Sequence, residues 1–231
     1  MDKQLIKKIA LIAAALLLVA FIAWIIIASL NKEEPVKNRE YDKAEVEAAA
    51  VALLEESKLL NEIYWGKGIP YVEDMSLASG SYYPANDIYL ESIGIETIDD
   101  LKRLTEKTYS KEMCDQIYKT VLSSVYTDTG LVGLARYEQV YSGKNNDVPD
   151  YIRVYTEAKC WFEDTVEYHP EVEALRSEGE TVYVMVLVTV TSHEDPEKVM
   201  NINLEIGLVE EEDGWRLDSP TYAKYYEDYT S

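Results

Sequence analysis

Two histidines and two cysteines are the side chains best suited to metal binding or nucleophilic chemistry, and the 231-residue chain holds only these four. His169 precedes Pro170, and His193 lies in an acidic run with Glu194 and Asp195. Metal sites need several ligands at recognisable spacing, and neither histidine has a second histidine or cysteine nearby. We therefore expect no metal and no cofactor, and we interpret the acidic run as an exposed connection between strands.

The two cysteines are predicted to face one core. Cys114 lies on the apolar stripe of a predicted helix, and Cys160 shares a strand face with Ile152 and Val154. An oxidising compartment would allow a disulfide between them. Two buried thiols that act as small hydrophobic side chains are the alternative.

A polar pocket is the remaining place where acid–base chemistry could occur. The predicted strand 151–162 places a row of polar and aromatic side chains on one face: Tyr151, Arg153, Tyr155, Glu157, Lys159 and Trp161. Arg136 and Glu138 share a face in the preceding strand. These side chains line either a pocket or a solvated sheet face with charge pairs across strands.

The candidate pocket or interface residues are Trp65, Arg136, Arg153, Tyr155, Trp161 and Trp215. We assign no catalytic role to any of them. The sequence has no nucleophile elbow, zinc-protease, phosphate-loop or calcium-loop motif.

Helices are predicted in the first half of the chain beyond residue 40. Apolar residues at steps of three and four predict a helix over 40–64, which Gly66, Gly68 and Pro70 end. Residues 70–95 lack a period and are predicted to form a long surface loop. The capping-box pattern from Thr97 to Asp100 predicts a helix to about residue 107, and Ser110 is expected to cap a helix over 111–125.

Strands are predicted after Gly130, where the hydrophobic period changes to two: 131–142, 151–162, 181–192, 199–210 and 214–219, with a weaker candidate at 171–176. Residues 182–190 are apolar at both even and odd positions, so this strand should be central and covered on both faces. Helices followed by antiparallel strands predict an α+β domain, with the helices on one face of a curved sheet.

The N-terminal part reads as a membrane anchor. Residues 9–30 carry no charge, and about 20 apolar residues suffice to cross a bilayer as a helix. A cleaved signal peptide and a buried helix are the alternatives, but both have shorter apolar runs. Lysines in residues 1–8 favour a cytoplasmic N-terminus and an extracytoplasmic C-terminal domain. The expected parts are the flank 1–8, the transmembrane helix 9–30, a linker 31–40, the domain 41–222 and an acidic, tyrosine-rich tail 223–231.

Charge limits the partners of the outer part. The chain has 22 Lys and Arg against 43 Asp and Glu. Residues 1–30 hold three lysines and one aspartate, so residues 31–231 carry 19 basic and 42 acidic residues, a net charge of −23. Nucleic acid is excluded because phosphate binding needs a basic surface. Nineteen tyrosines against two phenylalanines favour contact surfaces that are partly wet.

The order of elements resembles the NTF2-like superfamily of cone-shaped α+β domains. The resemblance covers about residues 40–222 and depends on the helices before the sheet and on the closing hairpin, in which residues 199–209 are followed by EEDGWRLD at 211–218. It implies a bacterial single-pass protein with an extracytoplasmic NTF2-like domain. The superfamily includes enzymes, ligand binders and assembly domains. We expect a non-enzymatic domain that binds a protein partner or self-associates, with small-ligand binding or sensing as the alternative and catalysis less favoured.

Overall fold

The computed structural model describes residues 39–73, 81–127, 130–141, 150–158, 160 and 163–223, with the main chain alone for 125–127 and 130–133. These residues belong to one compact unit, Arg39–Ser231. The predicted transmembrane segment 9–30, its flank, most of the linker and most of the C-terminal tail lie outside the described residues. Within the described ranges, no helix is long and apolar enough to cross a membrane.

Helix α2 (Lys43–Tyr64) confirms the first predicted helix. The Asp42 side chain caps its start by accepting hydrogen bonds from the main-chain N–H groups of Ala44 and Glu45. The predicted stripe is buried: Val46, Ala50, Leu53, Ser57, Leu60 and Tyr64.

A four-stranded antiparallel meander, in the order β6-β7-β8-β9, packs on α2. Its strands are β6 (Thr165–Glu178), β7 (Thr181–Thr191), β8 (Val199–Glu211) and β9 (Gly214–Leu217). The five even-numbered valines of β7 are fully buried and pair in register with apolar residues of β8. Strand β6 is much longer than the predicted 171–176, because its glutamates and Pro170 interrupt the apolar alternation on which the prediction depended.

The expectation that β7 is covered on both faces is wrong among the described residues. The odd-numbered face is only partly buried, and Leu187 remains 37% exposed. The apolar odd positions predicted burial, but the helix that packs on this sheet covers the valine face alone.

Helices α4 (Ile98–Thr108) and α5 (Lys111–Ile117) follow the predictions at their starts. Thr97 and Asp100 form the capping box, and Ser110 caps α5. The second helix stops short of the predicted residue 125: it continues as a π-helical turn, η1 (Tyr118–Leu122), and then gives way to a strand.

Residues 82–92 correct the prediction of an irregular loop. They form β1 (Tyr82–Pro84) and α3 (Asp87–Ser92), which Asn86 caps. Strand β1 pairs with β5 (Tyr151–Tyr155), which pairs with β4 (Tyr137–Val140) in a three-stranded antiparallel sheet. Strands β2 (Val125–Thr127) and β3 (Gly130–Gly133) form a separate hairpin. The predicted strand 131–142 is thus broken into two short strands, and 151–162 ends at Tyr155.

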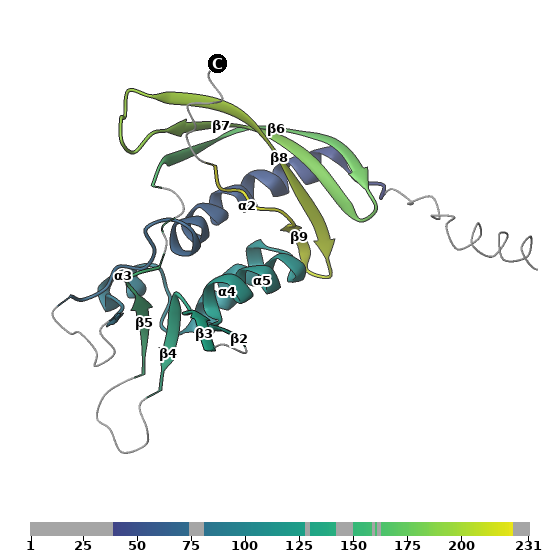
Figure 1. Ribbon diagram of the computed structural model, residues 1–231. Coiled ribbons are helices and arrows are strands. Elements are labelled where there is room, and N and C mark those ends of the chain that lie inside the picture. Colours follow the sequence, from purple (N-terminus) through teal and green to yellow (C-terminus); the bar gives the residue numbers. More distant parts are fainter. Residues whose placement is uncertain are drawn as a thin grey trace, which may run out of the picture. The chain divides into compact units, whose positions relative to one another are not determined.

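Helix α2 lies between two layers (Figure 1). The β6–β9 meander packs on one side, and α4 contacts α2 on the other and also contacts α5. The buried apolar residues of all these elements form one continuous core. The outer face of the meander points away from α2.

Candidate functional site

A polar hollow of about 290 Å³ opens beside the second half of α2, and we call it the α2–β6 hollow. Its lining carries both signs of charge, with two lysines and three acids. The lining residues are Lys58, Asn61, Glu62, Lys67, Glu163, Asp164, Thr165, Val166, Tyr168 and Tyr222. Side chains of this kind favour a small polar molecule over an apolar one.

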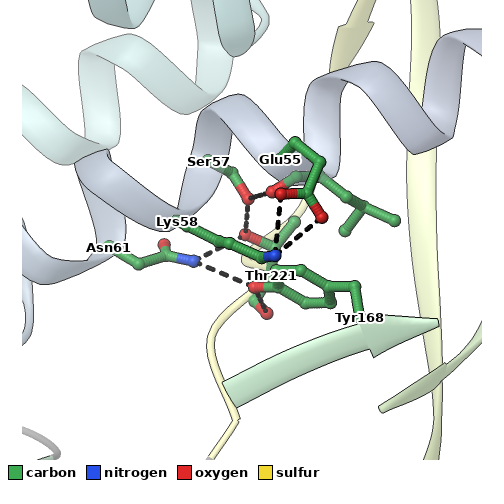
Figure 2. Close-up of polar contacts among 7 residues, drawn as sticks. Glu55, Ser57, Lys58, Asn61, Tyr168 and Thr221 are labelled. Atoms are coloured by element: carbon green, nitrogen blue, oxygen red, sulfur yellow. Dashed lines mark hydrogen bonds and ion pairs between the residues drawn. The ribbon is translucent and has the colours of Figure 1, made fainter. Parts of the chain in front are cut away.

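A buried hydrogen-bond cluster lies beside this hollow (Figure 2). Its centre is Thr221, whose hydroxyl accepts from Asn61 Nδ2 at 2.9 Å and donates to Ser57 Oγ at 2.9 Å. Tyr168 donates its hydroxyl proton to the Thr221 carbonyl at 2.8 Å, and Tyr109 donates to Asn61 Oδ1 at 3.2 Å. The cluster therefore ties α2 to β6, to the junction between α4 and α5, and to the segment after β9.

The polar groups of this cluster bond to one another, and none of them is activated as an acid, base or nucleophile. Burial raises the pKa of both Tyr109 and Tyr168, so both hydroxyls keep their protons and remain donors. Lys58 lies over the Tyr168 ring, 5.5 Å from its centre, while its ammonium is held by Glu55 at 2.6 Å. Among the described residues, every buried side-chain nitrogen and oxygen atom has a hydrogen-bond partner. A ligand in the hollow would meet satisfied groups at this wall.

Arg136 caps a helix instead of lining a pocket. Its guanidinium donates to the carbonyls of Tyr64 at 2.9 Å and Gly66 at 2.6 Å, at the C-terminal end of α2. Tyr137 donates to the Ile63 carbonyl at 2.5 Å, and burial raises its pKa to about 12. Helix α2 has no basic residue in its last turn, so this buried cation supplies the favourable charge at its C-terminal end.

Arg216 caps the C-terminal end of α4. Its Nε donates to the carbonyl of Glu106 at 2.9 Å, and its Nη2 pairs with Asp213 at 2.6 Å. Neighbouring Trp215 donates its indole N–H to Glu45 at 3.0 Å, and Arg39 stacks on the indole ring at 5.3 Å. These residues of β9 join the sheet to both helices.

Arg153 and Tyr155 lie on the three-stranded sheet. Arg153 is opposite Glu138 in the register, and its Nε donates to Glu138 Oε2 at 2.9 Å. Tyr155 packs on Tyr82, with ring centres 5.3 Å apart. This arrangement is the cross-strand charge pairing that the sequence offered as the alternative to a pocket.

The predicted candidate residues do not meet at one site. Trp65 follows α2 and contacts Tyr222 with ring centres 5.9 Å apart, whereas Trp215 lies beside Glu45 near the start of the same helix. Twenty helical residues between positions 45 and 65 span about 30 Å. Trp161 lies outside the described residues. Lys58, Asn61 and Thr221 were missed as partners because nothing in their local sequence shows which distant side chain they meet.

The cysteines and histidines contact neighbouring residues of the fold and do not gather at one site. Cys114 is buried, and burial raises its pKa to about 11, which keeps it as an unreactive thiol. It is not joined to Cys160 in a disulfide. His169 hydrogen-bonds Thr189 at 2.7 Å, and His193 lies 3.0 Å from Glu163. The described residues contain no group of three or more histidine, cysteine or acidic side chains placed to hold a metal ion.

A second, acidic hollow of about 620 Å³ lies between α5 and the β8–β9 turn. Five acids line it against Lys111 and Arg216, and the acids are Glu106, Asp115, Glu211, Glu212 and Asp213. Cys114 and Tyr118 also line it, and burial raises the pKa of both, so neither supplies a nucleophile at neutral pH.

The outer face of β7 carries a row of partly exposed apolar side chains. Tyr183, Met185 and Leu187 follow one another along it at every second residue. Thr189 continues the row and hydrogen-bonds Asn201 of β8 at 2.8 Å. Three neighbouring apolar side chains on a central strand, only partly buried, form a surface suited to contact with another polypeptide.

These elements define the class: a mixed α+β protein with antiparallel sheets and packed helices. Comparisons of the chain with models of protein families, with curated proteins and with solved structures give no match.

Proposed function

We propose that the chain is a bacterial single-pass membrane protein, anchored in the bilayer through residues 9–30, with an extracytoplasmic NTF2-like domain. The domain acts without catalysis and binds a protein partner or self-associates. The uncharged length of residues 9–30 supports the anchor. A long helix packed on a meander that ends in the β8–β9 hairpin supports the NTF2-like assignment.

The observation that carries the interaction function is the open outer face of β7. Leu187 is 37% exposed on a strand whose opposite face, formed by five valines, is fully buried. Most other candidate side chains are already engaged in capping, pairing or packing inside the domain: Arg136 and Arg216 hold helix ends, and Arg153 pairs with Glu138. The row of apolar side chains on this sheet face therefore supports an interaction function.

Site-specific photocrosslinking in the native cell tests the interaction. A photoreactive residue replaces Leu187 in the full chain, and a matched control replaces Ile88 of α3, which is 80% exposed. We expect a discrete protein adduct, or a dimer of the chain, from position 187 and none from position 88. Equal labelling at both positions, or no adduct at 187, would overturn the interaction function.

The anchor is tested separately. Membranes that contain the full chain are washed with alkaline carbonate, which removes peripheral proteins. We expect the chain to stay in the pellet, and protease added outside the cell to degrade the domain. Release into the wash, or protection from outside protease, contradicts the anchor or its orientation.

Small-ligand binding in the α2–β6 hollow is the second candidate function. Its lysines and acids lie close together, which suits a zwitterion such as an amino acid. A panel of amino acids should then raise the melting temperature of the full chain, and Lys67→Gln should reduce the shift. A panel that produces no shift removes this candidate.

A further inference from the structure

The outer face of the β6–β7–β8 sheet has an apolar centre and acidic flanks. Met185 of β7 lies opposite Glu173 of β6 on one side and Glu205 of β8 on the other. Leu187 lies opposite Asn203, and Tyr183 lies under the guanidinium of Arg176, 4.4 Å from the ring centre. The apolar row is thus one side chain wide, and glutamates flank it on both sides at Met185.

The charge on this face is negative and incompletely neutralised. Arg176 pairs with Glu178 at 2.8 Å and with Glu205 at 2.6 Å, so one positive charge is shared between two carboxylates. Glu173 has Lys43 within 4.0 Å but is 71% exposed, and Glu167 has no ion pair with another described residue. The side chains that flank the row therefore favour cations on whatever covers it.

The dimensions of the face match a helix. Every second residue of a strand advances about 6.8 Å, so Tyr183, Met185 and Leu187 present apolar groups at about that spacing. Residues i, i+4 and i+8 of an α-helix advance about 6 Å each time. Strands β6 and β8 lie about 10 Å apart across β7, close to the 10–12 Å diameter of a helix.

We propose that this face binds an amphipathic basic helix of a partner protein, laid along β7. The apolar stripe of the helix covers Met185 and Leu187 and ends against the Tyr183 ring under Arg176, and its Lys or Arg side chains meet Glu173 and Glu205. The inference rests on the proposed interaction function and names the chemistry of the partner. A second copy of the chain fits less well, because it would bring the same acidic surface, and residues 31–231 carry a net charge of −23.

The test uses the full chain in nanodiscs of zwitterionic lipid, with empty nanodiscs as the blank. The probe is a synthetic 18-residue helical peptide with leucine at i, i+4 and i+8 and flanking lysines. A second peptide has glutamate in place of every lysine. We expect the lysine peptide to bind more weakly in 0.5 M salt and the glutamate peptide not to bind.

Paired variants locate the site. Glu173→Gln with Glu205→Gln should weaken binding of the lysine peptide by about tenfold or more, a loss of about 1.4 kcal/mol. The control pair, Glu91→Gln with Glu96→Gln, removes the same charge from exposed positions on α3 and before α4, and should change binding by less than about threefold. Leu187→Asn should also weaken binding by about tenfold, and Met185→Gln repeats the test where the first variant fails to fold.

Equal weakening by the two glutamine pairs would show that the lysine peptide responds only to the net charge of the protein. That result would overturn the inference. Undiminished binding by folded Leu187→Asn and Met185→Gln proteins would do the same. These failures are separate from failure of the proposed function. If crosslinking at position 187 captures a second copy of the chain or an acidic partner, the interaction function stands and the basic-helix inference falls.

Discussion

Replacing Arg136 by methionine tests whether this buried cation holds the end of α2. Methionine keeps much of the length of the side chain but removes both donors to the Tyr64 and Gly66 carbonyls. Each hydrogen bond from a charged group contributes about 1.5–3 kcal/mol to stability. Part of the loss in the variant is offset, because the variant no longer buries a guanidinium. We expect the free energy of unfolding to fall by about 3 kcal/mol, a large part of the 5–15 kcal/mol typical of a domain.

Arg153→Met is the matched control for this prediction. Arg153 is an arginine of β5 that pairs with a carboxylate, and its side chain is 30% exposed and that of its partner Glu138 is 28% exposed. Partly exposed ion pairs contribute about 1 kcal/mol or less, so this variant should lose much less stability. Arg136→Lys should fall between the two, because one ammonium cannot reproduce the two-pronged contact.

The assay is urea unfolding of the full chain followed by tryptophan fluorescence, with hydrogen exchange measured on peptides from α2. Loss of the cap should speed exchange at the C-terminal end of α2 more than at its start. Equal stability losses for Arg136→Met and Arg153→Met, or unchanged exchange at the end of α2, would refute the assignment of Arg136 as its cap.

Three further predictions concern the buried polar residues and the close approach at Gly68. Thr221→Val removes a hydroxyl that contacts Asn61 and Ser57, and should lower the free energy of unfolding by about 2–3 kcal/mol in urea titrations; a loss below about 0.5 kcal/mol contradicts the cluster's structural role. Gly68→Ala should destabilise by more than about 1 kcal/mol in the same titration, because Gly68 has a φ of +86° and an added Cβ would lie 2.5 Å from Arg136 Nη2. Cys114 should react slowly with iodoacetamide at pH 8, where a pKa of about 11 leaves about 0.1% thiolate, and about tenfold faster per pH unit up to pH 10. Peptide mass spectrometry measures the rate of Cys114 modification, and rapid labelling of Cys114 at pH 8 contradicts the raised pKa.

Local signals in the sequence predicted the elements that depend on neighbouring residues. The stripe of α2, the capping box at Thr97 and the cap at Ser110 all use contacts within four residues, and all are present. The missed segment 82–92 has a short helix capped by Asn86 and a three-residue strand, both too short to show a period.

The candidate residues show where sequence reasoning stops. Arg136 and Trp215 were selected as pocket residues because of their types, yet each is bound to a residue 72 or 170 positions away. No local pattern encodes such a distance. The open face of β7 was also predicted as buried, since an apolar residue on a strand indicates a contact surface without indicating whether the same chain supplies the contact.

The position of Thr221 in the chain has a consequence for the order of biosynthesis. Helix α2 is made early, but the donors to its last carbonyls arrive with Arg136, and the hydroxyl that joins Ser57 and Asn61 arrives with Thr221. A nascent chain that has emerged only as far as β9 still lacks the group at the centre of its buried polar cluster. Completion of the domain therefore has to wait until nearly all of the described chain has left the ribosome, and during this interval α2 exposes the polar side chains that the finished fold conceals.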